Sequence, residues 1–231
     1  MTRADEFLEL YKKLEAIVAN NYGNRKEGGS VAKLGKRSEF RHIREELDYI
    51  RDVRNLLAHR PRISDDYVVE PSEGMIELIK KVIEKVERPA VAESIMVKLD
   101  DVISCNKGDF VIPALRKMNE KAIAYIPVLS EGRVCGVFSE RAFIQYTVSQ
   151  NRSVDEGTMF YEIEDVLSFD SSSVVKFLFT DRKTPIDELS DLFDEAAQND
   201  QKIGMIFVTE HGKDSEALLG IITAWDVAAA F

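Results

Sequence analysis

A strand–turn–strand pattern that occurs twice in the second half of the chain constrains the fold more than any other feature. The two hairpins are predicted at residues 121–138 and 203–222, where runs rich in apolar residues flank turns at Glu131-Gly132 and Gly212. An internal duplication of this kind predicts two units packed around a pseudo-twofold axis, with a ligand pocket at the seam between them.

Each predicted hairpin lies between two predicted helices. The preceding helices are expected at residues 110–118 and 185–197, and the following helices begin at Ser139 and Thr223. With a strand ahead of each first helix, the order is β-α-β-β-α in both copies. We therefore predict an α/β arrangement for this half of the chain.

The first part of the chain predicts helices only. Apolar residues recur at helical spacing over residues 4–19, over a segment from Ser38 to His59, and over a segment from Ser72 to Pro89. Because the domain has so few helices, we expect it to need a partner that buries their apolar faces, which favours a homodimer. The prediction is a multidomain protein with an all-α domain at residues 1–88, a first α/β repeat at 89–150 and a second at 151–231.

The second repeat ends in the motif Gly220-Ile-Ile-Thr223-Ala-Trp-Asp226. Thr223 is expected to end a strand and cap a helix, so that its hydroxyl and nearby backbone N–H groups can face a phosphate. Asp226, in the first helical turn, is placed to accept both hydroxyls of a ribose. The alternative is that Thr223 is only an N-cap and Asp226 only an acid that complements the helix dipole.

The motif and the duplicated element order resemble a pair of cystathionine-β-synthase (CBS) domains, also called a Bateman module, over roughly residues 91–231. The resemblance implies a regulatory protein that requires no cofactor and binds adenosine monophosphate (AMP) or a related adenosine ligand. The ligand-binding residues implied by the resemblance are Lys98, Val102, Ile103, Ile123, Ala124, Tyr125, Lys202, Gly220, Ile222, Thr223 and Asp226.

Two departures from the CBS pattern affect the expected ligand. The first repeat carries Ser139 and Ala142 where the second carries Thr223 and Asp226, so the second, pseudo-symmetric site is expected to be weak, empty or adapted to another ligand. Lys202 is the one basic residue next to the start of the second hairpin. This scarcity of positive charge favours AMP or a dinucleotide over a multiply phosphorylated ligand.

The end of the second predicted helix, Arg54-Asn55-Leu-Leu-Ala-His59, resembles the signature of HEPN domains, small helical dimers that include metal-independent ribonucleases and non-catalytic scaffolds. A histidine base and an arginine that stabilises the developing phosphorane charge would suit RNA cleavage, and Asn55 could orient His59 from four residues away. Alternatively, Arg54 forms an ion pair with Asp48, Asp52 or another acid, and the helix dipole favours His59.

The charge of the chain is distributed unevenly. Residues 1–88 hold 18 of the 31 basic and 17 of the 41 acidic residues, a balance of +1, so the rest of the chain carries −11, which together give the net charge of −10. Residues 22–44 contain seven basic residues and only two acidic residues, Glu27 and Glu39. This basic strip either contacts the phosphates of RNA or is an ordinary solvated surface.

Two functions of different classes are consistent with these features. The first is a cytoplasmic, homodimeric regulatory endoribonuclease in which nucleotide binding controls a cleft of Arg54, Asn55 and His59. The second is a non-catalytic nucleotide sensor whose helical domain only dimerises or docks a protein partner. No apolar run is long enough for a membrane span, and the two cysteines and three histidines show no metal-ligand spacing, so neither a membrane nor a metal is expected.

Overall fold

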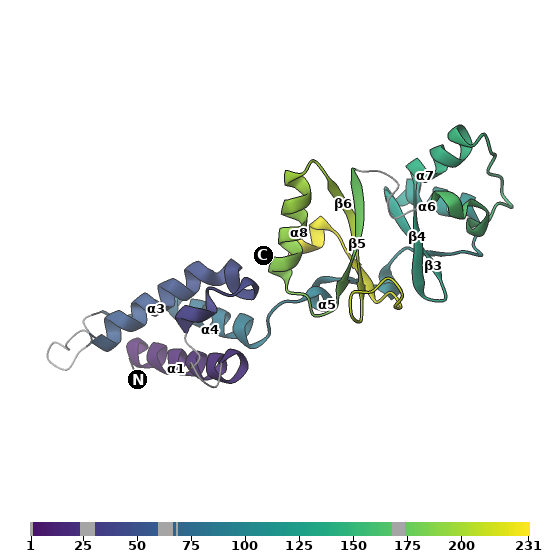
Figure 1. Ribbon diagram of the computed structural model, residues 1–231. Helices are drawn as coiled ribbons and strands as arrows, with labels where there is room; N and C mark the ends of the chain where they lie inside the picture. Colours follow the sequence, from purple (N-terminus) through teal and green to yellow (C-terminus); the bar gives the residue numbers. More distant parts are fainter. Residues whose placement is uncertain (1, 24–30, 60–66, 68, 168–173) are drawn as a thin grey trace. The chain divides into compact units, whose positions relative to one another are not determined.

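The computed structural model describes residues 2–23, 31–59, 67, 69–167 and 174–231. It divides into two compact units, Met1–Ala90 (unit 1) and Val91–Phe231 (unit 2), which are described separately here (Figure 1). None of the helices in the described ranges is long and apolar enough to cross a bilayer.

Unit 1 is helical throughout its described part. Its elements are α1 (Arg3–Tyr22), α2 (Val31–Leu34), the 3-10 helix η1 (Ser38–Ile43), α3 (Arg44–His59) and α4 (Glu73–Glu87). The helix expected from Ser38 therefore begins as a 3-10 segment, and it becomes α-helical only at Arg44. Ser72 caps α4 as predicted, because its hydroxyl accepts a hydrogen bond from the backbone N–H of Met75 at 3.2 Å.

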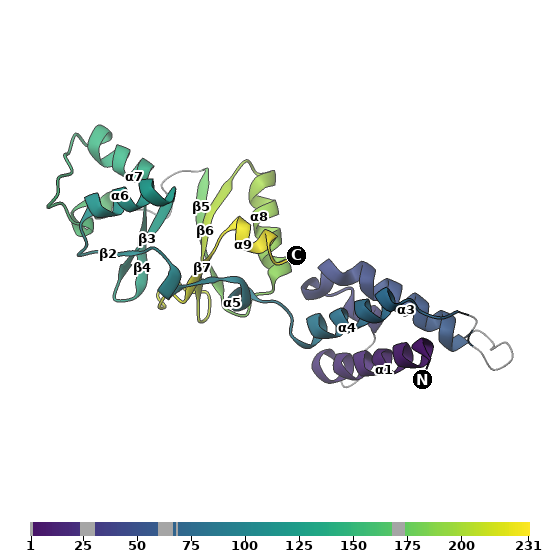
Figure 2. The ribbon, with the colours of Figure 1, turned by 180° about the vertical axis from the view of Figure 1, so that it is seen from behind.

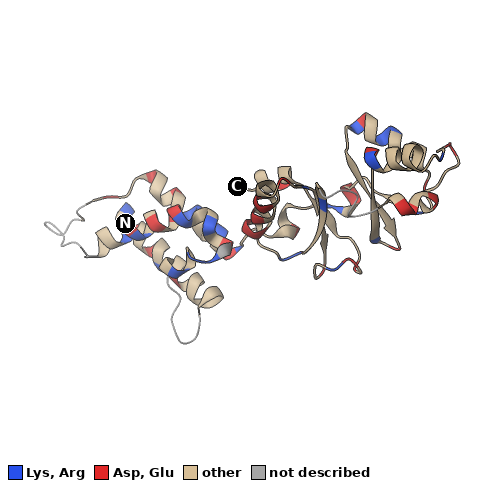
Figure 3. Cartoon of the chain, turned by 45° about the horizontal axis from the view of Figure 1, so that its top comes forward, with Lys and Arg blue, Asp and Glu red and all other residues tan. Residues whose placement is uncertain are grey.

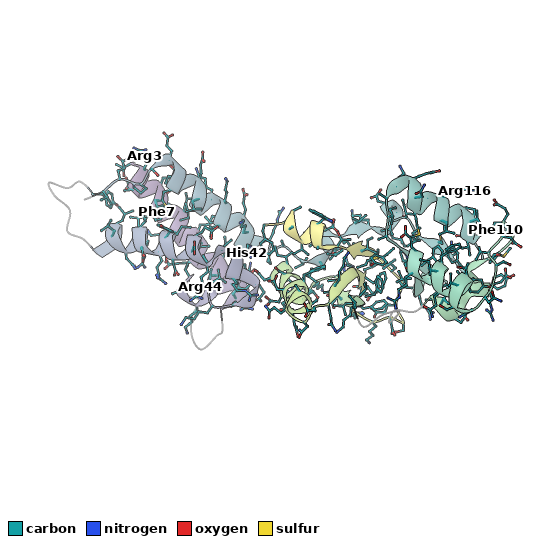
Figure 4. The ribbon with its side chains drawn as sticks, turned by 90° about the horizontal axis from the view of Figure 1, so that it is seen from above. Arg3, Phe7, His42, Arg44, Phe110 and Arg116 are labelled. Atoms are coloured by element: carbon teal, nitrogen blue, oxygen red, sulfur yellow. The ribbon has the colours of Figure 1, made fainter. Side chains whose placement is uncertain are left out.

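The helices of unit 1 bury their apolar faces against one another. Phe7 and Leu14 of α1, Ile50 of α3 and Ile79 of α4 are completely buried in one core. Figure 4 shows Phe7 between the helices of unit 1. The three long helices thus cover one another within a single chain, and the homodimer expected from the sequence stays a prediction.

Unit 2 contains two sheets with the same internal order. The three-stranded sheet of the first copy runs β2 (Cys105–Asn106), β3 (Tyr125–Ser130) and β4 (Arg133–Ser139), and the sheet of the second copy contains β5 (Val175–Asp181), β6 (Lys202–Thr209) and β7 (Gly220–Ile222). In each copy the first two strands are parallel and the last two are antiparallel. The structure therefore shows the duplication that the two hairpins predict.

Helices cover the outer faces of both sheets. Figures 1 and 2 show α6 (Val111–Lys121) and α7 (Glu140–Ile144) on one side of β3 and β4, and α8 (Ile186–Gln198) on one side of β5 and β6. The second helix of each copy is short, because α7 and α9 (Ala224–Ala228) have five residues each. A π-helical turn, Gln145–Ser149, continues α7.

The two sheets of unit 2 meet in a shared core. Its buried members are Leu129, Val134 and Val137 from the first copy and Phe177, Met205, Phe207 and Leu218 from the second. Tyr125 also contacts Phe177 edge-to-face across this interface, with ring centroids 5.2 Å apart. The seam between the copies is thus a packed hydrophobic interface.

The first strand expected in copy one is divided between the two sheets. β1 (Val97–Lys98) pairs antiparallel with β7 of the second copy, and only after a 3-10 turn does the chain reach β2 in the first sheet. Ahead of β1, the short helix α5 (Ala92–Ile95) also attaches to the second copy, because the backbone N–H of Ala92 donates to the carbonyl of Thr184 at 2.8 Å. The first copy therefore contributes the α5–β1 segment to the second copy, and the two copies also share a core.

Candidate ligand site at the seam of unit 2

A cavity of about 520 Å³ opens at the seam between the two copies. We call it the seam cavity. Both copies supply its lining residues, which are Val97, Asp101, Val102, Ile103, Ala122, Ile123, Ala124, Tyr125, Lys202, Ile203, Gly204, Met205, Ile221, Thr223, Ala224 and Trp225. Its volume is within the range of small-molecule sites, which usually combine an apolar wall with a few polar groups.

The structure brings together seven of the residues implied for ligand binding. Val102, Ile103, Ile123, Ala124, Tyr125, Lys202 and Thr223 all line the seam cavity. They come from four segments of the chain: the stretch after β1, the start of β3, the start of β6, and the residue after β7. The fold thus places one wall from each copy around a common space.

Four implied residues are not in the lining, and each has another position. Lys98 is exposed on β1, where it pairs with Gly220. A Cβ atom on Gly220 would lie 2.4 Å from the carbonyl oxygen of Val97, so glycine is needed for this strand contact. Ile222 is completely buried in the core of the second copy. Asp226 is half-buried in α9, directly behind Thr223.

Thr223 and Asp226 form a capping pair. The backbone N–H and the hydroxyl of Thr223 both donate to Oδ2 of Asp226, at 2.7 Å each. The alternative that this pair serves helix capping is therefore part of the structure. The other carboxylate oxygen, Oδ1, accepts no hydrogen bond from the described residues, and a hydroxyl donor could use it.

The charge of the seam cavity is small. Asp101 and Lys202 are its charged lining residues, and both are exposed. One positive and one negative group give little attraction for an extended anion. Because α9 has five residues, the partial positive charge at its N-terminus adds little to this field.

Sequence reasoning missed several lining residues, and one of them is notable. Trp225 is the only tryptophan in the chain, it is 85% exposed, and it lines the seam cavity. Its position between Thr223 and Asp226 in the motif was the available signal. Val97 gave no such signal, since only the pairing of β1 with β7 places it at the cavity.

A second cavity, of about 630 Å³, lies beside the corresponding motif of the first copy. Ser139, Glu140 and Arg141 line it, whereas Ala142 is buried and takes the place of Asp226. Residues 122–125 line both cavities, and Ala122 there has a left-handed backbone with φ of 52°. This cavity therefore has the basic side chain of Arg141 and lacks a carboxylate at the position that corresponds to Asp226.

Arg54 in unit 1 is engaged by its neighbours. Its Nη2 lies 3.5 Å from Oε1 of Glu15, its guanidinium lies 5.3 Å from the ring centroid of Tyr11, and its Nη1 donates to Oδ1 of Asn55 at 3.2 Å. Glu15 was not among the named acids expected to pair with Arg54, because the packing of α1 on α3 determines this contact. His59 ends α3, and its side chain lies outside the described part of the chain.

The basic strip is only partly described. Arg25 and Lys26 lie outside the described residues, whereas Lys33, Lys36, Arg37, Arg41 and Arg44 are exposed. Arg37 is paired with Glu39, with 2.8 Å between Nη2 and Oε1, and it lies over the ring of Tyr22. Figure 3 shows basic and acidic residues interspersed over unit 1. The described part of the strip is therefore a surface of mixed charge.

No group of three or more His, Cys, Asp or Glu side chains that could hold a metal ion occurs in the part of the chain that the structure describes. Cys105 is buried and Cys135 half-buried, and both are free thiols. Burial raises the pKa of Cys105 to about 11, which makes it a poor nucleophile at neutral pH.

Residues 91–149 match the family model of the CBS domain. This stretch of the chain is similar to a CBS domain. The α/β fold of unit 2, with its repeated sheet and seam, fits a CBS pair. No curated protein matches the chain significantly.

Several solved structures are similar to the chain over about three fifths of its length. Hypoxic response protein I, solved with two coordinated zinc ions, is 19% identical, with 62% of this chain and 99% of that chain covered and a TM-score of 0.43. CBSX2 in complex with AMP is 18% identical, with 61% and 94% covered and a TM-score of 0.43. A signal-transduction protein with CBS domains from Burkholderia ambifaria is 25% identical, with 61% and 91% covered and a TM-score of 0.40.

Proposed function

We propose that unit 2 is a sensor that binds AMP or a related adenosine ligand in the seam cavity. The observation that carries this proposal is the meeting of Thr223 from the second copy with Val102, Ile103 and residues 123–125 from the first. A ligand at this place contacts both copies and can therefore respond to, or alter, their relative arrangement.

The chemistry of the lining suits a nucleoside monophosphate. Ile103, Ile123 and Tyr125 supply an apolar wall for a planar base. Asp226 does not line the cavity itself but lies directly behind Thr223, and its Oδ1 atom is available for a ribose hydroxyl that reaches past Thr223, which occupies only Oδ2. Lys202 is the one lysine or arginine in the lining, which is enough charge for a single phosphate and little for a longer chain.

Calorimetric titration of the full chain with AMP tests this function. We expect saturable heat with wild-type protein and a loss of at least tenfold in affinity for Asp226→Ala, because a hydrogen bond to a charged group is worth about 1.5–3 kcal/mol. Asp100→Ala, which changes an exposed acid that does not line the cavity, is the matched control. No heat with any adenosine nucleotide, or unchanged affinity in Asp226→Ala, refutes the site.

The second part of the proposal is that ligand binding controls unit 1. Such control requires the ligand to bind one state of the protein better than another, because a ligand with equal affinity for both shifts nothing. Hydrogen exchange of the amides in α3, measured with and without AMP, tests it directly. Identical exchange rates in both conditions would show that unit 1 does not respond to the ligand.

Metal-independent endoribonuclease activity in unit 1 is the second candidate function. It is supported by the placement of Arg54 and Asn55 in direct contact near the end of α3, four or five residues before His59. The alternative, a non-catalytic unit that dimerises or docks a protein, is favoured by the contacts of Arg54 with Glu15 and Tyr11. RNA cleavage by wild type but not by His59→Ala, with and without AMP, supports the enzyme; intact RNA with the wild type removes it.

A further inference from the structure

Trp225 has two properties that rarely occur together. It is the most exposed of the large hydrophobic side chains in the described ranges, at 85%, and it also lines the seam cavity. A side chain that borders a cavity while most of its surface meets solvent stands at the mouth of that cavity. An indole left in water keeps a large apolar surface unburied, and a ligand that covers it gains from that surface.

The first copy of the repeat provides an internal comparison. Thr223-Ala224-Trp225-Asp226 corresponds in position to Ser139-Glu140-Arg141-Ala142, since each tetrapeptide follows the last strand of its copy and opens the next helix. Trp225 therefore stands where the second cavity has the guanidinium of Arg141. At the same relative place, one cavity has an anion-binding side chain and the other has an aromatic one.

The surroundings of Trp225 do not replace the missing charge. The helix that carries it, α9, contains Asp226 and no basic residue. Lys202 is the one basic side chain in the lining, and the negative charge of Asp101 in the same lining offsets its positive charge. A diphosphate or triphosphate that extends past Trp225 would meet an indole where the first copy has a guanidinium, and α9 offers no cation in its place.

We propose that Trp225 contacts the bound adenosine ligand, closes the mouth of the seam cavity over it, and makes the site select adenosine and AMP against ADP and ATP. The proposal rests on the proposed adenosine-sensing function and deepens it by naming the ligand class. The indole gains contact with the ligand, and the absence of a cation at its position removes the partner that a longer phosphate chain needs.

Because Trp225 is the only tryptophan, its fluorescence reports on this site alone. The experiment titrates the full chain with adenosine, AMP, ADP and ATP, following indole emission and heat in parallel. We expect AMP to change the emission in step with the heat, and ADP and ATP to bind at least tenfold more weakly. Trp225→Ala should weaken AMP binding by about tenfold, the size typical of losing one base–aromatic stack, whereas Trp225→Phe should keep most of the affinity.

Two further variants sharpen the test. Trp225→Arg gives the second copy the side chain of the first, so it should raise the affinity for ADP and ATP relative to AMP. Ile144→Ala is the matched control, because Ile144 is an exposed apolar residue on α7 that lines neither cavity, and AMP binding should not change. Since Trp225 is exposed, its replacement should leave the thermal unfolding of unit 2 unaltered.

The outcomes distinguish the proposed role of Trp225 from the proposed adenosine-sensing function on which it rests. AMP heat with constant indole emission and equal affinities in wild type and Trp225→Ala overturns the role of Trp225 and leaves the sensor intact. ATP that binds as tightly as AMP in the wild type overturns the selectivity. Wild-type protein that gives no heat and no emission change with any of the four ligands overturns both.

Discussion

The carboxylate of Asp226 accepts both the backbone N–H and the hydroxyl of Thr223 on a single oxygen, Oδ2. Capping and the proposed ligand binding therefore use different oxygens of one side chain. This arrangement predicts that the two roles can be separated by substitution, since an amide keeps one acceptor oxygen and loses the charge and the second acceptor.

Asp226→Asn should keep the cap, with its amide oxygen toward Thr223, while the affinity for AMP falls at least tenfold. Asp226→Ala should lose both, with a stability cost of roughly 0.5–2 kcal/mol, the range for removing a cap. Thermal unfolding and calorimetry on the two variants measure this. Equal destabilisation by both variants would contradict the separation.

Gly220→Ala should destabilise unit 2. A Cβ atom there would lie 2.4 Å from the carbonyl oxygen of Val97, so β1 and β7 must move apart, at a cost of about 1–3 kcal/mol. Gly108→Ala is the control, because nothing lies within 4 Å of the added carbon. Urea unfolding compares the two, and a Gly220→Ala protein as stable as the control would show that the strand contact is not close.

Glu216 should stabilise the β6–β7 loop in a pH-dependent way. The backbone N–H of His211 donates to its carboxylate at 2.7 Å, and this and further hydrogen bonds lower the pKa of Glu216 from 4.5 to about 2. A lowered pKa means that the ionised form stabilises the folded state above pH 4.5, and that this stabilisation disappears as the pH falls to about 2.

Glu216→Gln is therefore expected to unfold at a lower temperature than wild type at pH 7, with a difference that narrows between pH 4.5 and 2. Melting curves at a series of pH values measure it, and an NMR titration of the Glu216 carboxyl carbon gives its pKa independently. A difference in melting temperature that is constant over this range would contradict the assignment.

Arg54→Ala should loosen the contact between α1 and α3 by about 0.5–1 kcal/mol, because it removes a half-exposed ion pair with Glu15 and a cation–π contact with Tyr11. Arg51→Ala is the matched control, since Arg51 pairs within its own helix, with Asp48 at 2.9 Å. Hydrogen exchange in α1 distinguishes the two variants. If both change it equally, Arg54 does not hold the helices together.

Local features of the fold were predictable because they depend on neighbouring residues. The turn at Glu131-Gly132 is an example, since both residues have positive φ, 51° and 77°, as two-residue hairpin turns require. The capping of α4 by Ser72 is another. The predicted hairpins and helices of unit 2 follow from such short-range signals together with their repetition.

Long-range pairing could not be predicted in the same way. Nothing in the pattern around Val97 indicates that its strand joins β7, more than a hundred residues later, and the place of Val97 in the cavity lining follows from that pairing. Likewise, the contact of Arg54 with Glu15 depends on how α1 packs against α3. Seven of the residues that the resemblance to a CBS pair implies for ligand binding do line the cavity. They were predictable because the resemblance rests on a motif within a repeat.

The pairing of β1 with β7 also determines an order of folding. During synthesis on the ribosome, α5 and β1 emerge before the sheet of the first copy is complete, whereas β7, the partner of β1, is one of the last strands to be made. The sheet of the first copy can form from β2 to β4 while β1 is still unpaired. Closure of the long loop between β1 and β7 is slow. During that interval the unpaired segment is open to exchange with a second nascent chain, the event that produces domain-swapped dimers.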